Sequence, residues 1–241
     1  MYQFDSRVRF SETDRNGKLT LEGIVDYFQD CSTFQTEDLG VGFSYLQPKG
    51  LTWVLSYWQI VVDEYSSLGD KITIATLPYE FKGFLGSRNF CIFNEQGKRI
   101  VCANSLWTLL NIEKQIPQRI TEEMLARYPK EEKMEMEYAS RKIIISGEEQ
   151  KQEPVIIQKH HLDCNNHVNN GQYIRICATY LPEDYPIRQM RAEYRKQAIL
   201  GDMLYPYCYE EENKIIISLC DSEKKPYTIV EFTRKENTCY I

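Results

Sequence analysis

Residues 161–174 read His-Leu-Asp-Cys-Asn-Asn-His-Val-Asn-Asn-Gly-Gln-Tyr-Ile, and the interpretation of the whole chain starts from this stretch. Its polar first half follows a run, 154–160, that has the composition of a strand. Its second half opens a segment with apolar residues at the i, i+3, i+4 spacing of a helix with one buried stripe. The stripe comprises Val168, Tyr173, Ile174, Cys177 and Tyr180. The stretch therefore predicts a polar turn that leads directly into an amphipathic helix.

The first half of the chain contains a copy of the same pattern. Residues 14–19 read D-x-N-x-K-L, against D-x-N-x-H-V at residues 163–168, and the offset is 163 − 14 = 149 residues. A second echo, Leu-Gly-Asp at 68–70 and at 200–202, has an offset of 200 − 68 = 132 residues. Repeated patterns at such offsets indicate an internal duplication. The second copy is then 149 − 132 = 17 residues shorter between helix and turn.

Both halves turn to strands after the helical segment. The strand-like segments are rich in β-branched and aromatic residues and are joined by polar turns. They span residues 53–65, 71–81, 88–93, 99–112, 188–199, 202–209, 214–220 and 228–234. In each unit the helix must cover one sheet face. We predict an α+β fold with an N-terminal domain at 1–120, a linker and first strand region at 121–145, and a C-terminal domain at 146–241.

The composition excludes several classes of protein. A net charge of −6 argues against a general nucleic-acid binder. The eight cysteines, which include Cys239, are scattered without a CxxC pair. We therefore expect buried, reduced thiols and neither disulfides nor a metal site. Residues 1–10 alternate like a strand and carry no export signal. No apolar run approaches the roughly 20 residues of a membrane span, so we expect a cytoplasmic protein.

Two stretches resemble one enzyme family. The string H-L-D-x-N-x-H-V-N-N-x-x-Y-I at 161–174 is similar to a segment of the acyl-ACP thioesterases of bacteria and plastids. Residues 190–197, Met-Arg-Ala-Glu-Tyr-Arg-Lys-Gln, resemble the family's E-Y-R-[RK]-E strand. The layout fits the family's two tandem hot-dog domains, each an antiparallel sheet wrapped around a long helix. Without a plastid targeting peptide the chain resembles the bacterial form.

The resemblance implies an activity and a partner. It implies hydrolysis of the thioester bond of a fatty acyl chain on acyl carrier protein, with release of free fatty acid. It implies no metal and no organic cofactor. Acyl-CoA as a substrate, the preferred chain length and a homodimer stay open.

The motif supplies the groups that thioester hydrolysis needs, which are an activated water and a stabilised oxyanion. Alternation on an extended segment places residues 163, 165 and 167 on one side. We expect His167 to activate the water or to protonate the leaving thiolate. Asp163 would orient the imidazole, and Asn165 would hold the water or the carbonyl. The start of the following helix adds free N–H groups and a positive dipole end.

A purely structural role for the motif is the alternative, because Asn and Asp cap helices readily. The first copy argues against it, since Lys18 stands where the second copy has His167. If the motif only capped helices, the histidine would have no particular meaning. The asymmetry indicates one active and one degenerate site.

The chain departs from the family pattern at two positions. Gln197 and Ala198 stand where the family commonly has Glu and then Cys. Ala198 rules out a thiol nucleophile there, and Gln197 can hold a water but cannot take its proton. Asp163 with His167 then supplies the base, or Glu193, four residues before Gln197 on the predicted strand face, substitutes for it.

The first half is expected to determine specificity. Trp53, Leu55 and Trp58 are candidates to line a tunnel for an acyl chain, and ordinary core packing is the alternative for each of them. A basic landing patch for the acidic carrier protein is a further hypothesis, against the alternative of a solvated face. Its candidate residues are Arg188, Arg191, Arg195, Lys196 and Lys82.

Two other functions remain open from the sequence, because hot-dog folds also serve as binding modules and a fold does not fix a function. One is a non-catalytic module that binds acyl thioesters or fatty acids. The other is a dehydratase for β-hydroxyacyl thioesters, for which the sequence has no signature. Release of a free thiol distinguishes a hydrolase from a binder.

Overall fold

The computed structural model describes residues 1–235 and divides the chain into two compact units. The first comprises Met1–Trp58 and Asp63–Tyr138, and the second comprises Gln59–Val62 and the chain from Ala139 onward. Within the part described, no helix is both long and apolar enough to cross a membrane. Cys239 of the sequence prediction lies outside the described residues.

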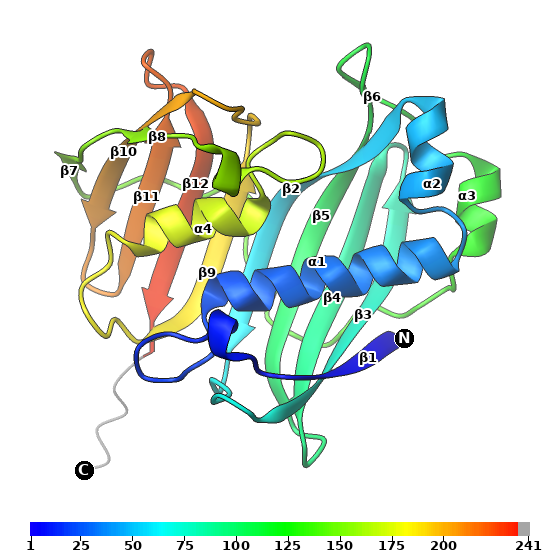
Figure 1. Ribbon diagram of the computed structural model, residues 1–241, viewed down its shortest axis with the longest axis horizontal. Coiled ribbons are helices and arrows are strands. Elements are labelled where there is room, and N and C mark those ends of the chain that lie inside the picture. Colours follow the sequence, from blue (N-terminus) through cyan, green and yellow to red (C-terminus); the bar gives the residue numbers. More distant parts are fainter. Residues whose placement is uncertain (236–241) are drawn as a thin grey trace. The chain divides into compact units, whose positions relative to one another are not determined.

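The first unit is an antiparallel sheet with one long helix against it (Figure 1). The sheet order is β1-β3-β4-β5-β2, and β6 pairs with β5. The strands are β1 (Tyr2–Arg7), β2 (Leu51–Val62, of which Gln59–Val62 belong to the second unit), β3 (Lys71–Lys82), β4 (Leu85–Asn94), β5 (Arg99–Asn111) and β6 (Ile116–Pro117). The helices are α1 (Leu21–Asp38), α2 (Phe43–Leu46) and α3 (Glu122–Arg127), with 3-10 turns at Phe10–Glu12 and Gln47–Lys49.

Helix α1 forms where the sequence predicts a helix. Thr20 caps its N-terminus by accepting a hydrogen bond from Gly23 N at 3.2 Å. Its buried stripe packs on the sheet, and the Phe28 ring lies 5.0 Å from the Phe90 ring of β4 and 5.8 Å from the Trp58 ring of β2. Burial of such aromatic side chains is the main stabilising contribution of this core.

The second unit repeats the arrangement with a shorter helix. Its sheet order is β9-β12-β11-β10-β7, and β8 pairs with β10. The strands are β7 (Glu148–Lys151), β8 (Val155–Ile156), β9 (Ile187–Tyr194), β10 (Met203–Glu210), β11 (Lys214–Cys220) and β12 (Pro226–Arg234). Helix α4 (Asn170–Ala178) is capped by Asn169, whose side chain accepts from Gly171 N at 2.8 Å. It ends two residues before Tyr180, the last residue of the predicted stripe.

The predicted duplication is present in the backbone hydrogen bonds. In the first unit Val8 donates to the Asp70 carbonyl, and the Asp70 side chain accepts from Ser67 N. In the second unit Ile157 donates to the Asp202 carbonyl in the same way, and the Asp202 side chain accepts from Ile199 N. The two Leu-Gly-Asp turns therefore make equivalent hydrogen bonds in the two units.

The segment between the last strand of one unit and the first strand of the other is not all linker. Residues 122–127, inside the predicted linker, form α3. Thr121 caps this helix, Glu122 and Glu123 lie at its N-terminus and Arg127 at its C-terminus, which suits the helix dipole. Met124 of this six-residue helix is fully buried. Six residues give too few apolar positions for a periodic signal, so the sequence pattern did not reveal the helix.

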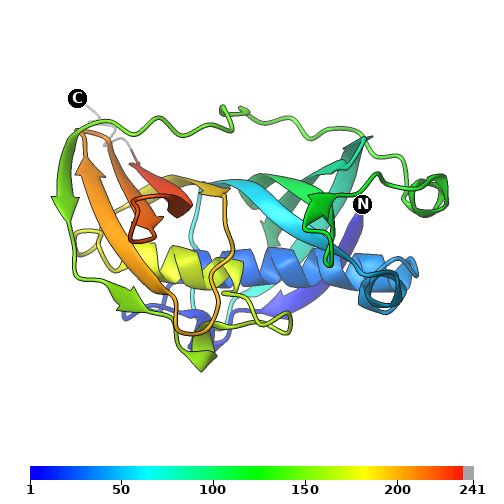
Figure 2. The ribbon, with the colours of Figure 1, turned by 90° about the horizontal axis from the view of Figure 1, so that it is seen from above.

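An extended segment, residues 128–147, follows α3 and is called the strap below. In each unit it crosses the sheet face opposite to that unit's main helix (Figure 2). In the first unit the fully buried Asn89 fixes it, because its Oδ1 accepts from Met134 N at 3.1 Å and from the Tyr138 hydroxyl at 3.0 Å. In the second unit Arg191 donates to the Ser140 carbonyl at 2.7 Å, and Ile143 N donates to the Glu193 carboxylate.

Asp26 of α1 gives the fold a pH dependence. Desolvation, followed by the negative charges of Asp30, Glu22 and Glu12, raises the pKa of Asp26 to about 6. The folded state then binds this proton more tightly than the unfolded state does. The stabilising contribution is greatest in acid and is lost as the pH rises through about 6. We expect Asp26→Asn to stabilise the protein at pH 7.5 by less than about 1 kcal/mol, because the carboxylate is in contact with water.

Thermal unfolding at pH 7.5 and at pH 4 measures this effect. The gain in melting temperature should be present at pH 7.5 and nearly absent at pH 4, where Asp26 is already protonated. An equal gain at both pH values would show that the carboxylate charge is not the cause.

Candidate active site

The motif forms a closed loop before α4. Leu162 and Val168 form a β-bridge across its base. Inside it, Asp163 N donates to the His167 carbonyl at 2.8 Å and Asn166 N donates to the Asp163 carbonyl at 3.1 Å. Asn166 has a φ of 60°, a left-handed conformation that Asn adopts more readily than most residues. The loop therefore has one defined backbone path.

The Asp163 carboxylate determines that path. Its Oδ1 accepts hydrogen bonds from Asn165 N at 2.8 Å and from His167 N at 3.4 Å. Among residues 1–235, the structure shows no hydrogen bond from the His167 imidazole to this carboxylate. The contact between Asp163 and His167 that the structure shows is to the His167 backbone amide. The cause is the i, i+2, i+4 spacing, which brings the amides of the turn to the first carboxylate.

The loop at 14–19 has the same construction without the histidine. Asp14 Oδ1 accepts from Asn16 N at 2.8 Å and from Lys18 N at 2.9 Å, and Asp14 N donates to the Lys18 carbonyl at 2.8 Å. Gly17, with a φ of 70°, takes the place of Asn166. Lys18 reaches out to Ser67 Oγ at 2.9 Å. The aspartate therefore has the same structural role in both copies, and His167 is the chemical difference between them.

His167 is half-buried, and its Nδ1 is buried without a hydrogen-bond partner in the part of the chain that the structure describes. A neutral imidazole has one ring nitrogen that donates and one that accepts. The other two histidines make contacts of a different kind. His161 Nδ1 accepts from Gln158 N at 3.0 Å, and the ring of His160 lies 4.1 Å from that of His161. His167 is thus the histidine with a buried ring nitrogen that has no hydrogen-bond partner among the described residues.

A second segment lies beside the loop. Val168 N donates to the Ala198 carbonyl at 3.0 Å, and Ala198 N donates to the Tyr173 hydroxyl at 2.8 Å. Gln197 is exposed and directly precedes Ala198, and His167 directly precedes Val168. Because Val168 and Ala198 are hydrogen-bonded, Gln197 and His167 each lie one residue from this pair. Burial raises the pKa of Tyr173, which keeps the hydroxyl protonated. The sequence pattern identified Tyr173 only as a residue of the buried stripe, and nothing local in it indicated this long-range contact.

The expected strand face that Glu193 and Gln197 would share does not exist, because β9 ends at Tyr194. Tyr194 points toward α4, where its hydroxyl donates to the Asn170 carbonyl at 3.1 Å. Glu193 is its neighbour and points to the opposite face, where Arg195 Nη2 lies 2.9 Å from its carboxylate. The sheet separates Glu193 from α4, and this placement argues against Glu193 as a substitute base.

The three candidates for a tunnel in the first unit differ in their surroundings. Leu55 and Trp58 are fully buried, and Trp58 packs on Phe28 and Phe90 in the core. Leu55 and Trp58 therefore pack in the core, which is the alternative to lining a tunnel. Trp53 is only partly buried and packs against a separate cluster. That cluster consists of Val41, Leu46, Leu109, Ile120, Met124 and Tyr128.

Three cations of the predicted landing patch have ion-pair partners. Arg191 forms a bridge of 2.7 Å with Glu231, which is nearly fully buried, and Lys196 lies 3.3 Å from Asp221. Arg195 is bound to Glu193. These three cations and Arg188 belong to the second unit, whereas Lys82 belongs to the first.

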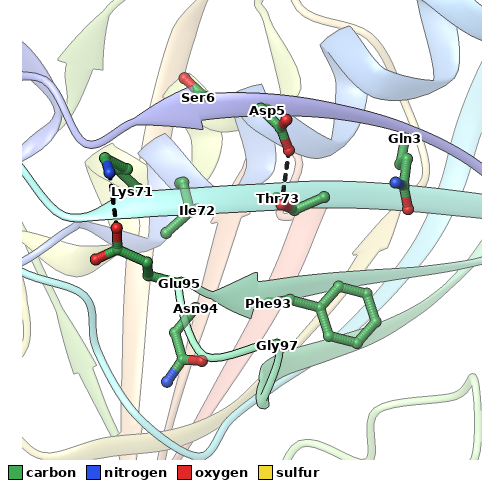
Figure 3. A pocket seen from close by; sticks show the side chains of 10 residues that line it. All are labelled: Gln3, Asp5, Ser6, Lys71, Ile72, Thr73, Phe93, Asn94, Glu95 and Gly97. Atoms are coloured by element: carbon green, nitrogen blue, oxygen red, sulfur yellow. Dashed lines mark hydrogen bonds and ion pairs between the residues drawn. The ribbon is translucent and has the colours of Figure 1, made fainter.

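A polar hollow of about 450 Å³ lies in the first unit beside β1, β3 and the turn after β4 (Figure 3). Lys71 Nζ is bound to Glu95 at 2.7 Å, and Thr73 donates to Asp5 at 2.7 Å. Four of the side chains that line the hollow are therefore paired with one another. Among the described residues, no three His, Cys, Asp or Glu side chains are placed to hold a metal ion.

The described cysteines fit the expectation of reduced thiols for the most part. The seven that the structure describes are free, and all but Cys164 are buried. Burial raises the pKa of Cys31 and of Cys91 to about 12. Cys164 is exposed at the tip of the His167 loop.

Comparison with known proteins identifies the family. Residues 1–128 match the acyl-ACP thioesterase N-terminal domain, and residues 144–230 match the acyl-ACP thioesterase C-terminal domain. The chain belongs to the acyl-ACP thioesterase family.

Relatives in plants support this assignment. The chain is 25% identical to the oleoyl-acyl carrier protein thioesterase 2 of Arabidopsis thaliana over 88% of its own length and 63% of that protein. It is 24% identical to an acyl-[acyl-carrier-protein] hydrolase of Cuphea viscosissima over 91% of its length and 61% of that protein. The chain thus spans less than two thirds of the length of these relatives.

Solved structures show the fold. An acyl-ACP thioesterase from Bacteroides thetaiotaomicron superposes with a TM-score of 0.87 at 24% identity, over 96% of both chains. The 12:0-ACP thioesterase from Umbellularia californica gives 0.82 at 15% identity, also over 96% of both chains. The predicted α+β fold with tandem hot-dog domains is confirmed.

The two loops offer a matched test of the aspartate. Asp163→Ala and Asp14→Ala each remove the acceptor of two backbone amides. We expect each to lower the free energy of unfolding by about 1–2 kcal/mol. Urea unfolding measures both variants under one condition. A neutral effect of either substitution would contradict the structural role of that carboxylate.

Proposed function

We propose that this chain hydrolyses the thioester bond of a fatty acyl chain on acyl carrier protein and releases free fatty acid. The observation that carries the proposal is the His167 imidazole on a loop whose counterpart in the first unit carries Lys18. The two loops share their backbone hydrogen bonds, so a structural requirement does not explain the histidine. Membership of the family supports the same activity.

The reaction needs one group that first accepts a proton and later donates it. His167 takes a proton from a water as the water oxygen attacks the thioester carbonyl carbon. The tetrahedral oxyanion then collapses, and the carbon–sulfur bond breaks. The imidazolium returns the proton to the leaving thiolate, which gives a free thiol and a carboxylic acid. No redox step and no organic cofactor enters this balance.

Neighbouring groups hold the reactants in this scheme. The Asp163 carboxylate fixes the loop so that the His167 backbone has one position. Asn165, exposed on the same loop, holds the water or the thioester carbonyl through its side-chain amide. Gln197 supplies a further amide from the adjacent segment. Because an amide cannot accept the water's proton, His167 is the general base in this proposal.

His167→Ala should lower kcat by about 10²- to 10⁴-fold, the usual contribution of a general base. Lys18→Ala is the matched control on the equivalent loop and should keep hydrolysis near the level of the unaltered protein. A colorimetric assay for free thiol, with acyl-ACP and acyl-CoA of several chain lengths, measures both variants. The same panel identifies the carrier and the chain length.

Two outcomes would contradict the proposal. An unchanged rate in His167→Ala would remove this residue from the mechanism. Retention of intact acyl thioester by the unaltered protein, without thiol release, would indicate a binding module instead.

Gln197 allows a separate prediction. If its amide holds the water, Gln197→Ala should lower kcat by roughly tenfold, the equivalent of one hydrogen bond of about 1.4 kcal/mol. Gln197→Glu offers an acceptor in the same place and should make the rate depend on an additional ionisation in the pH profile. The measurement is kcat against pH for both variants. Unchanged profiles in both would show that this position has no role.

A further inference from the structure

The second unit has a groove that the proposed reaction does not use. It is a hollow of about 500 Å³ between the strap and the sheet, on the face opposite to α4. Ile143 of the strap, Tyr209 of β10 and Ile229 of β12 form its floor and belong to one buried apolar cluster. A hollow of this size is in the range of pockets that hold small molecules.

The apolar surface continues along the strap to the outside. Ile144 and Ile145 line the groove, and 70% and 39% of their surfaces are exposed. Two adjacent exposed isoleucines on a fixed segment are unfavourable in water, and covering them releases about 25 cal/mol for each Å² of apolar area. The groove therefore favours a ligand with an aliphatic part.

Three cations line the groove, and two of them are paired with carboxylates. Lys142, Arg195 and Lys224 line it, and no carboxylate does so among the described residues. This is notable in a chain whose net charge is −6. Arg195 and Lys224 are bound to Glu193 and Glu149, at 2.9 Å and 2.7 Å, from outside the lining. Lys142 has no ion pair within residues 1–235.

The walls of the groove are held in place without a ligand. The backbone of Ile143 is bound to the Glu193 carboxylate, and the Ser146 hydroxyl is bound to Glu211. Gly147 follows with a φ of 99°, and a Cβ at this position would lie 2.8 Å from the Glu210 carbonyl oxygen. The strap can approach β10 closely because this residue is glycine. A fixed strap lowers the entropic cost of binding.

We propose that this groove is a binding site for a long-chain carboxylate, a free fatty acid. The carboxylate lies at Lys142, Arg195 and Lys224, and the alkyl chain lies along the strap isoleucines and Ile229. The sheet separates the groove from α4, so the ligand here is distinct from a thioester at the His167 loop. A cationic rim over an apolar hollow fits this head group and tail. The proposal does not depend on hydrolysis.

Binding can be observed directly on protein labelled at the isoleucine δ1 methyl groups. Decanoate is titrated below its micelle concentration into the full chain. We expect saturable shifts at Ile144, Ile145 and Ile229. Decanol, which has the same chain without the charge, should bind about tenfold more weakly.

Variants connect the binding to the rim. Lys142→Glu should weaken decanoate binding about tenfold, because an exposed cation becomes a repelling charge. Lys142→Arg should keep it. Lys130→Glu, the same charge change at an exposed strap position in the first unit, is the control and should bind decanoate as the unaltered protein does.

Four results would overturn the proposal. One is that decanoate shifts only isoleucines outside the groove, such as Ile174 of α4. The second is equal affinity for decanoate and decanol. The third is equal affinity of Lys142→Glu and the unaltered protein. Binding to vesicles of an anionic phospholipid without binding of monomeric decanoate would also overturn it, because the ligand would then be a membrane surface.

Discussion

The hydrogen bonds between one carboxylate oxygen of Asp163 and the amides of Asn165 and His167 are the constraint on which the candidate site depends. They turn a six-residue stretch into a closed loop with one backbone path, and the bridge between Leu162 and Val168 closes its base. A loop of this kind can hold a side chain in one place with little loss of entropy during the reaction. The loop backbone thus fixes the position from which the imidazole extends.

The first loop of the duplicated chain offers an internal comparison for the role of Asp163. Asp14 arranges the first loop in the same way, and Gly17 and Asn166 take the same left-handed conformation. The two copies share the aspartate and a residue with positive φ, and they differ at the last polar residue of the loop. The loop does not require the histidine, since Lys18 serves in the first copy and is bound to Ser67.

Each unit uses the two faces of its sheet for different purposes. One face receives the helix, and in the second unit also Tyr194, whose hydroxyl is bound to the start of α4. The opposite face receives the strap, through Asn89 in the first unit and through Arg191 and Glu193 in the second. Because side chains alternate along a strand, neighbours such as Glu193 and Tyr194 take part in unrelated structures. The groove lies on this second face, beside the strap.

The sequence by itself determined the features that depend on local spacing. The two loops, the helical stripes and the repeated Leu-Gly-Asp turns all follow from residues a few positions apart, where chain geometry is fixed. Only the tertiary structure decided which partners meet across the chain. It placed Glu193 on the far side of the sheet, joined Tyr173 to Ala198 and tied Arg191 to Glu231. These contacts join segments up to 40 residues apart, and pairing at that range is set by strand register and packing, which no local pattern records.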